Sequence, residues 1–288
     1  MAFIAPKGTE LIRFLGGGSV FEVALVRLQD AEVVCKRLVP NALDTREGRA
    51  AMIREARLCA MVDHPALPKL IRVGNDWRGP FFLQSYIAGE SLSRILEAWR
   101  DKGFSIPDTL VRHIAVQAFS ALAEIAELSD EKGPLGIVHG DIGPDHILLG
   151  PFGEVSFVDL GAARFRDLEP ELLTDDKGTL PFVAPEVARG EVAAGQPADI
   201  YALAASLLFF GVGQPLCHAK TDAAILAEVA TQGVRRELFG HATAFRQEER
   251  EILHLALDLD PQKRPKTARE ILDVLLRVEQ EAATPALR

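Results

Sequence analysis

The sequence predicts an α+β fold with two lobes: a small β-rich lobe at the N-terminus and a larger helical lobe after it. Strand-like apolar runs bounded by glycine-containing turns dominate the first part of the chain. After Ser91 the apolar residues mostly recur with the 3.6-residue period of a helix. The chain has 288 residues, which is enough to bury a core in each part. We place the lobes at residues 1–87 and 88–288.

The expected strands come in order along the small lobe. Residues 11–28 hold two apolar runs around a glycine-rich turn, and residues 31–38 hold a third. Residues 47–62 then follow a helical period. Residues 69–87 contain two further runs, joined by a turn at Asn75–Gly79. We therefore expect five strands and one helix here.

The larger lobe is expected to be mostly helical. Residues 111–125 form one apolar helical face, residues 198–210 are apolar on every side, and residues 244–278 carry further helical patterns. Two short β-like runs interrupt the helices, at Ile137–Gly150 and Ser156–Arg164, and each is broken by an aspartate. Functional sites often form between two such lobes.

Bulk properties exclude several classes of function. The net charge of −9 argues against nucleic acid or an anionic membrane as the main partner. The longest apolar stretch, residues 200–213, is too short to span a bilayer, and the N-terminus lacks the pattern of a signal peptide. Cys35, Cys59 and Cys217 show no metal-binding spacing, so we interpret them as reduced thiols. A cytoplasmic protein is expected.

Three stretches suggest binding of an anionic ligand. Leu15–Val23 is glycine-rich, so its amides can approach phosphate oxygens, although a plain hairpin turn is the simpler interpretation. Lys36 interrupts an apolar strand, and Glu55 lies near the apolar stripe of the following helix. Their pairing would aim the ammonium at an anion, whereas alone Lys36 fits an outward-facing position.

The two aspartates on the short β-like runs, Asp141 and Asp159, could divide the chemistry. One carboxylate could accept a proton from a hydroxyl, and the other could hold a divalent metal. The alternative is that both are buried aspartates with structural hydrogen bonds.

Taken in order, these motifs resemble those of the protein kinase family over nearly the whole chain. The resemblance is to a serine/threonine-type, bacterial-like stand-alone kinase domain. The matching residues are Gly16, Gly18 and Val23 of the glycine loop, Lys36, Glu55, His139, Asp141, Asp159, Gly161, the Gly178–Phe182 segment, Ala184–Glu186, Asp199 and Arg264.

The resemblance implies ATP between the lobes, with Mg²⁺ or Mn²⁺ as the metal. Lys36, oriented by Glu55, would hold the α and β phosphates, and Asp141 would act as the catalytic base. Asp159, with His146 beside it, would hold the metal. The other nucleotide-binding residues would be Leu15, Gly16, Gly17, Gly18, Val23, Cys35, Gln84, Tyr86 and Leu148.

Four positions depart from the family pattern. Phe21 replaces the third loop glycine, and Gly140 replaces the arginine that usually receives an activation-loop phosphate, so switching by phosphorylation is not expected. Gly143 replaces a lysine that contacts the transferred phosphate. His146 replaces the metal-binding asparagine, and imidazole suits Mn²⁺ or Zn²⁺ better than Mg²⁺.

These departures leave three functions open. The first is phosphoryl transfer from ATP to serine or threonine hydroxyls of a protein substrate. The second is a pseudokinase that binds nucleotide or acts as a scaffold for a regulatory protein partner. The third is a small-molecule phosphotransferase, since His139-Gly140-Asp141 is similar to the loop of that group, which however lacks the Ala184–Glu186 and Arg264 motifs.

Overall fold

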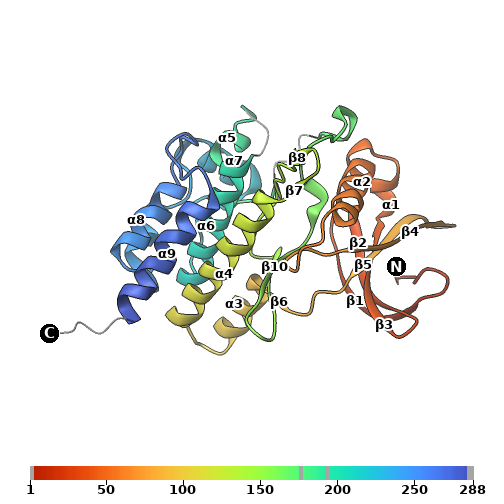
Figure 1. Ribbon diagram of the computed structural model, residues 1–288, viewed down its shortest axis with the longest axis horizontal. Helices are drawn as coiled ribbons and strands as arrows, with labels where there is room; N and C mark the ends of the chain where they lie inside the picture. Colours follow the sequence, from red (N-terminus) through yellow and green to blue (C-terminus); the bar gives the residue numbers. More distant parts are fainter. Residues whose placement is uncertain (1–2, 175–177, 192–194, 284–288) are drawn as a thin grey trace.

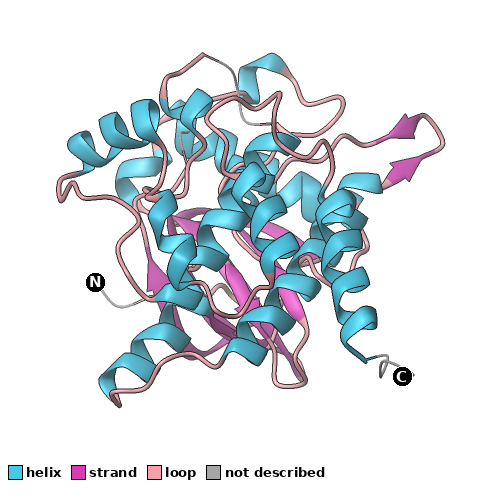
Figure 2. Cartoon of the chain, turned by 90° about the vertical axis from the view of Figure 1, so that its left-hand side faces the viewer, coloured by secondary structure: helices cyan, strands magenta, loops and turns pink. Residues whose placement is uncertain are grey.

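The computed structural model describes residues 3–174, 178–191 and 195–283. Figure 1 shows the β-rich and helical lobes side by side, and Figure 2 shows the sheet of the small lobe behind the helices of the large one. The expected α+β architecture is confirmed.

The small lobe is built on an antiparallel five-stranded sheet with the strand order β1-β2-β3-β5-β4. One long helix, α2 (Arg46–Met61), and a short one, α1 (Pro40–Leu43), lie between β3 and β4 in the chain. The strands are β1 (Glu10–Gly17), β2 (Phe21–Leu28), β3 (Ala31–Leu38), β4 (Leu70–Asp76) and β5 (Gly79–Ser85).

Strand alternation gives this sheet two different faces. Cys35 and Val33 on β3 point to one face, where Phe3 from the N-terminal segment covers them. Lys36, the residue after Cys35, therefore points to the other face, where Phe21 and Phe82 pack against α2. The functional side chains of β3 are thus restricted to the side that faces α2.

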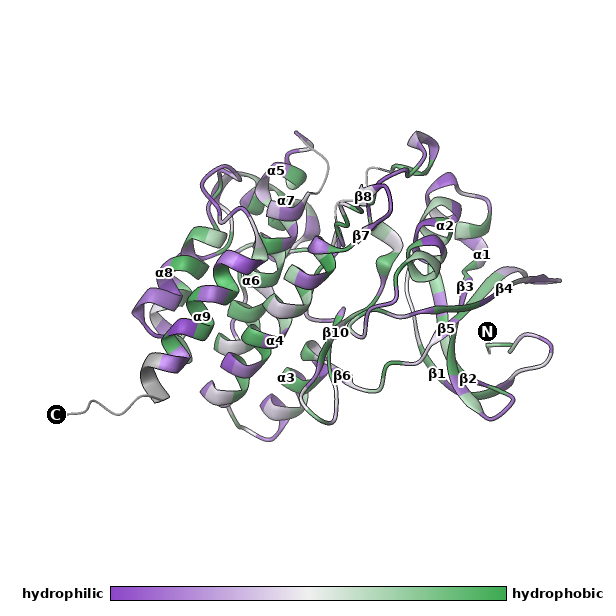
Figure 3. Cartoon of the chain, in the orientation of Figure 1, coloured by the Kyte–Doolittle hydropathy of each residue, from purple (hydrophilic) through white to green (hydrophobic). Residues whose placement is uncertain are grey.

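The large lobe is organised around α6 (Gln196–Val212), whose side chains are buried along nearly its whole length. Helices α3, α4 and α8 contact it, and Figure 3 shows apolar residues gathered on α6 and α4. The helices are α3 (Leu92–Asp101), α4 (Asp108–Glu127), α5 (Pro185–Ala188), α6, α7 (Asp222–Gln232), α8 (Gln247–Ala256) and α9 (Ala268–Ala283).

Short elements connect the two lobes and carry the loops of interest. The pairs β6 (Glu90–Ser91) with β9 (Ile147–Leu149) and β9 with β10 (Val155–Phe157) form a small sheet, and β7 (Ser129–Asp130) pairs with β8 (Gly133–Pro134). Short 3-10 helices follow at η1 (Leu160–Ala162), η2 (Pro170–Leu172) and η3 (Arg236–His241). Across the described residues, no helix combines the length and apolar character that a membrane span requires.

Two sets of buried polar contacts hold the loops of the large lobe in place. Arg264 donates to both carboxylate oxygens of Glu186 at 2.7 and 2.6 Å, and both side chains are buried. Asp199, at the start of α6, accepts from the backbone N–H groups of His139 and Gly140 at 2.7 and 2.9 Å. The loop that carries Asp141 is therefore anchored to the central helix.

Candidate active site

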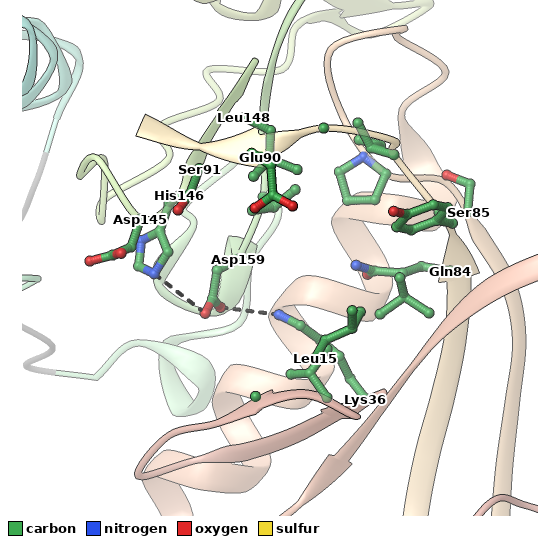
Figure 4. Close-up of a pocket in the computed structure, with 18 of the residues that line it drawn as sticks. Leu15, Lys36, Gln84, Ser85, Glu90, Ser91, Asp145, His146, Leu148 and Asp159 are labelled. Carbon is green, nitrogen blue, oxygen red and sulfur yellow. Dashed lines mark hydrogen bonds and ion pairs between the residues drawn. The ribbon is translucent and has the colours of Figure 1, made fainter. Parts of the chain in front are cut away.

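A cavity of about 500 Å³ lies between the lobes, and most of the predicted ligand-binding residues line it. Figure 4 shows Lys36, Asp159 and His146 along one side, with Leu15 and Leu148 on opposite walls. The lining residues from the prediction are Leu15, Gly16, Gly17, Val23, Lys36, Gln84, Tyr86, His146, Leu148 and Asp159.

Two of the predicted nucleotide-binding residues do not line the cavity. Placing Cys35 there was wrong, because strand alternation turns its side chain to the far face of the sheet, beneath Phe3. Val34, which shares the face of Lys36, takes that place on the cavity wall. Gly18 lies instead at the turn between β1 and β2, where its N–H donates to the carbonyl of Phe21 at 2.9 Å.

Lys36 lies at the centre of a buried charge cluster. Its Nζ donates to Glu55 Oε1 and Oε2 at 2.7 and 2.9 Å and to Asp159 Oδ1 at 3.2 Å. Burial alone would lower the pKa of Lys36, but the two carboxylates raise it, so the ammonium stays charged. The cluster joins β3, α2 and the segment after β10.

Asp159 is held ionised at the edge of this cluster. Burial opposes the carboxylate, but the Lys36 ammonium and the His146 imidazole outweigh it and lower the pKa of Asp159 to about 2. Its backbone adopts the left-handed region, with φ of 66°, which is uncommon for a residue other than glycine and is frequent at functional sites.

Phe21 folds beneath the glycine loop. The side chain is buried, its ring centroid is 4.9 Å from Lys36 Nζ, and it meets Phe82 edge to face. A cation over an aromatic face is stabilised by the ring quadrupole. The ring therefore covers Lys36 on the side away from the cavity and fills space that a glycine would leave open.

Asp141 is held by Thr179 of the Gly178–Phe182 segment. Its Oδ1 accepts from the backbone N–H and the hydroxyl of Thr179, both at 2.7 Å. Burial raises the pKa of Asp141 against the opposing charge of His146. A carboxylate with a raised pKa is a better proton acceptor near neutral pH than an ordinary aspartate.

His146 links the two aspartates. Its Nδ1 lies 2.8 Å from the backbone carbonyl of Asp141, so this nitrogen donates, and Nε2 is left facing Asp159 Oδ2 at 3.7 Å. Burial opposes the imidazolium, but the carboxylates of Asp141 and Asp159 raise the pKa of His146.

The donor set fits a divalent metal bound together with a phosphate ligand. Within the described ranges, no group of three or more histidine, cysteine or acidic side chains could hold a metal by itself. Mg²⁺ is usually bound by one or two protein carboxylates, with substrate phosphates and water completing the shell. Asp159 with His146 supplies such a partial set, and the nitrogen ligand favours Mn²⁺ more than asparagine would.

Sequence reasoning missed several residues near the site. Val34 could have been found from alternation with Lys36, two residues on. Arg13, Glu90 and Arg94 line the mouth of the cavity, and they carry no motif in the sequence.

Comparison with known proteins agrees with this geometry. The tyrosine-protein kinase MasK of Myxococcus xanthus is 29% identical over 92% of this chain and 42% of its own length. The serine/threonine-protein kinases PknD of Chlamydia caviae and of Chlamydia trachomatis are 30% and 31% identical, over 67% of this chain and 23% of theirs. The chain thus spans less than half the length of these relatives.

The family assignment rests on a match along most of the chain. Residues 9–275 match the protein kinase domain. That range includes the sheet, the cavity, the Lys36–Glu55 pair and both aspartates. The chain therefore belongs to the protein kinase family.

Proposed function

We propose that this protein transfers the γ-phosphate of ATP to serine or threonine hydroxyls of proteins, with Mg²⁺ or Mn²⁺. The observation that carries the proposal is the assembled charge cluster, in which Lys36 contacts both Glu55 and Asp159. Such a cluster presents one buried cation and one ionised carboxylate to a cavity between two lobes, which suits a metal–triphosphate ligand.

Each residue has a role that its surroundings support. The adenine would lie between the apolar walls made by Leu15, Val23, Val34 and Leu148. The Lys36 ammonium would hold phosphate oxygens, and Asp159 with His146 would hold the metal, which supplies charge neutralisation on the phosphates. Asp141 would orient the acceptor hydroxyl and accept its proton.

Transfer to serine or threonine is favoured by the segment that contacts Asp141. Gly178–Phe182 resembles the corresponding segment of serine/threonine kinases, and its Thr179 bonds directly to the proposed base. The relatives include both kinds by name, since PknD is called a serine/threonine kinase and MasK a tyrosine kinase. Phosphoamino-acid analysis of a labelled substrate distinguishes the two.

A nucleotide-binding protein without transfer activity is the second candidate. Gly143 and His146 remove a cation and an oxygen ligand from the catalytic loop, and the Phe21 ring occupies space beneath the glycine loop. These changes weaken stabilisation of the transition state more than binding of the base and ribose.

A small-molecule phosphotransferase is the third candidate. Gly140 gives the loop a likeness to that group, but the buried Arg264–Glu186 pair and the Thr179 contact belong to the protein-kinase pattern.

One experiment separates the three candidates. Thermal shift with ATP and either metal reports binding, because a ligand stabilises the folded state by mass action. Transfer of labelled γ-phosphate to a generic protein substrate and to a panel of small hydroxylated acceptors then reports chemistry. We expect binding together with transfer to protein, and loss of transfer alone in Asp141→Asn.

A further inference from the structure

Arg54, the residue before Glu55 on α2, is buried with only 2% of its surface exposed. Its Nε donates to the carbonyl of Gly161 at 2.6 Å, and Nη1 donates to the carbonyl of Leu172 at 2.6 Å and to the Thr174 hydroxyl at 2.5 Å. These three acceptors are uncharged, and all lie on the segment that follows Asp159. One guanidinium thus holds both ends of residues 161–174.

The neighbouring arginines hold the same segment. From α2, Arg46 donates to the carbonyl of Glu171 at 3.1 and 3.0 Å, and Arg57 pairs with Glu169. From within the segment, Arg164 donates to the carbonyl of Thr174 at 3.1 Å. Figure 1 shows this green segment running beside α2. The contacts fix it against the helix.

Arg54 and Glu55 both contact the turn that follows Asp159, the proposed metal-binding aspartate. The backbone N–H of Leu160 lies close to the Glu55 carboxylate, and Arg54 donates to the carbonyl of Gly161. Glu55 also accepts from Lys36. A shift of α2 away from the sheet would therefore break the Lys36 pair and the hold on the turn at the same time.

The cation that contacts this segment comes from α2 and not from the loop that carries Asp141. Gly140 replaces the arginine that usually receives an activation-loop phosphate, and Arg54 instead brings a guanidinium to Thr174 from α2. An arginine at position 140 could not do so, because the backbone there has φ of +78° and a Cβ would lie 2.7 Å from the carbonyl oxygen of Ala162.

We propose, resting on the proposed function, that Arg54 is a positioning residue that orders residues 160–174 and the Lys36–Glu55–Asp159 cluster without a phosphate on that segment. The carbonyls of Gly161 and Leu172 and the Thr174 hydroxyl are among the acceptors of this guanidinium. Thr174 is itself buried and its hydroxyl already accepts from Arg54, so the guanidinium holds this threonine in its unmodified form.

The test compares Arg54→Gln with Arg49→Gln. Arg49 lies on the same helix but is exposed and donates to the carbonyls of Thr45 and Asp44, away from the segment. In protein that mass spectrometry shows to be unphosphorylated, we expect amide exchange across 160–174 to be about tenfold faster in Arg54→Gln and unchanged in Arg49→Gln. We expect kcat for peptide phosphorylation to fall about tenfold, with a smaller change in KM for the peptide.

Arg54→Lys keeps the charge but not the planar set of donors, so its amide exchange rate and kcat should lie between those of wild type and Arg54→Gln. If Arg54→Gln fails to fold, Arg54→Lys takes its place in the comparison. Unchanged exchange in the folded Arg54 variants would overturn the proposal. So would a wild-type segment that becomes protected only after phosphorylation. If wild type transfers no phosphate, the exchange result still decides the role of Arg54, and only the proposed function fails.

Discussion

Restoring a lysine at Gly143 should increase phosphoryl transfer. A Cβ added at this position would lie 3.6 Å from Phe182 Cδ2 and 3.8 Å from Thr179 Cβ, which are ordinary contacts, and its φ is not in the left-handed region. The side chain therefore fits beside the residues that hold Asp141. One positioned donor at a developing charge raises the rate by roughly 10²–10³. We expect Gly143→Lys, whose ammonium is not oriented by a designed partner, to raise the transfer rate by about tenfold.

The assay is the initial rate of γ-phosphate transfer at saturating ATP for wild type, Gly143→Lys and Gly143→Gln. Glutamine is a neutral control that adds a side chain without the cation, so it should leave the rate within about twofold. Gly140→Arg is the contrasting variant, because its left-handed backbone and the 2.7 Å approach to Ala162 forbid a side chain; it should lose about 1–2 kcal/mol of stability and gain no activity. Equal rates for the lysine and glutamine variants, or a gain in Gly140→Arg, would refute the reasoning.

Three further outcomes are expected. Arg264→Met leaves the buried Glu186 carboxylate without its bidentate partner, so the free energy of unfolding measured in urea should fall by about 3–5 kcal/mol. Arg269→Met, which breaks an exposed pair between α9 and Glu127 of α4, should cost less than about 1 kcal/mol, and similar losses in the two variants would contradict this prediction. His146→Asn should raise turnover with Mg²⁺ more than with Mn²⁺, and a loss with both metals would show that the imidazole has another role. Burial lowers the pKa of His139 from 6.5 to about 3, so the unfolded state binds more protons between these pH values. The contribution of His139 to stability is therefore complete above about pH 6.5, and the free energy of unfolding should fall by up to about 1.4 kcal/mol per pH unit as the pH drops. This slope should be shallower in His139→Gln, and equal slopes for the two proteins would contradict the prediction.

The sequence predicted those parts of the site that lie on strands or helices with a regular repeat of apolar residues. Lys36 interrupts an apolar strand and Glu55 lies on the apolar side of a helix, so each had to find a partner of opposite charge within the small lobe. The strands and the long helices follow for the same reason, because their faces repeat every two or 3.6 residues. The same rule, applied to Cys35, would have shown that it faces away from Lys36.

The remaining features depend on contacts between distant segments. Arg54 lies on the buried stripe of α2, as Glu55 does, but its acceptors include backbone carbonyls more than a hundred residues away, which leave no pattern of residue types. The orientation of Phe21 was undecided from sequence, because either side of the loop could accept the ring. Packing against Phe82 and α2 holds it inside.

The central claim, that this kinase-family chain is catalytic and uses Asp141 as its base, is tested most directly by one measurement. Wild type and Asp141→Asn are each incubated with labelled ATP, with Mg²⁺ and with Mn²⁺, and ATP binding and γ-phosphate transfer to protein serine and threonine are measured on the same samples. The account predicts equal nucleotide binding by both proteins and transfer by wild type alone. Binding without transfer by wild type, or undiminished transfer by Asp141→Asn, would contradict it.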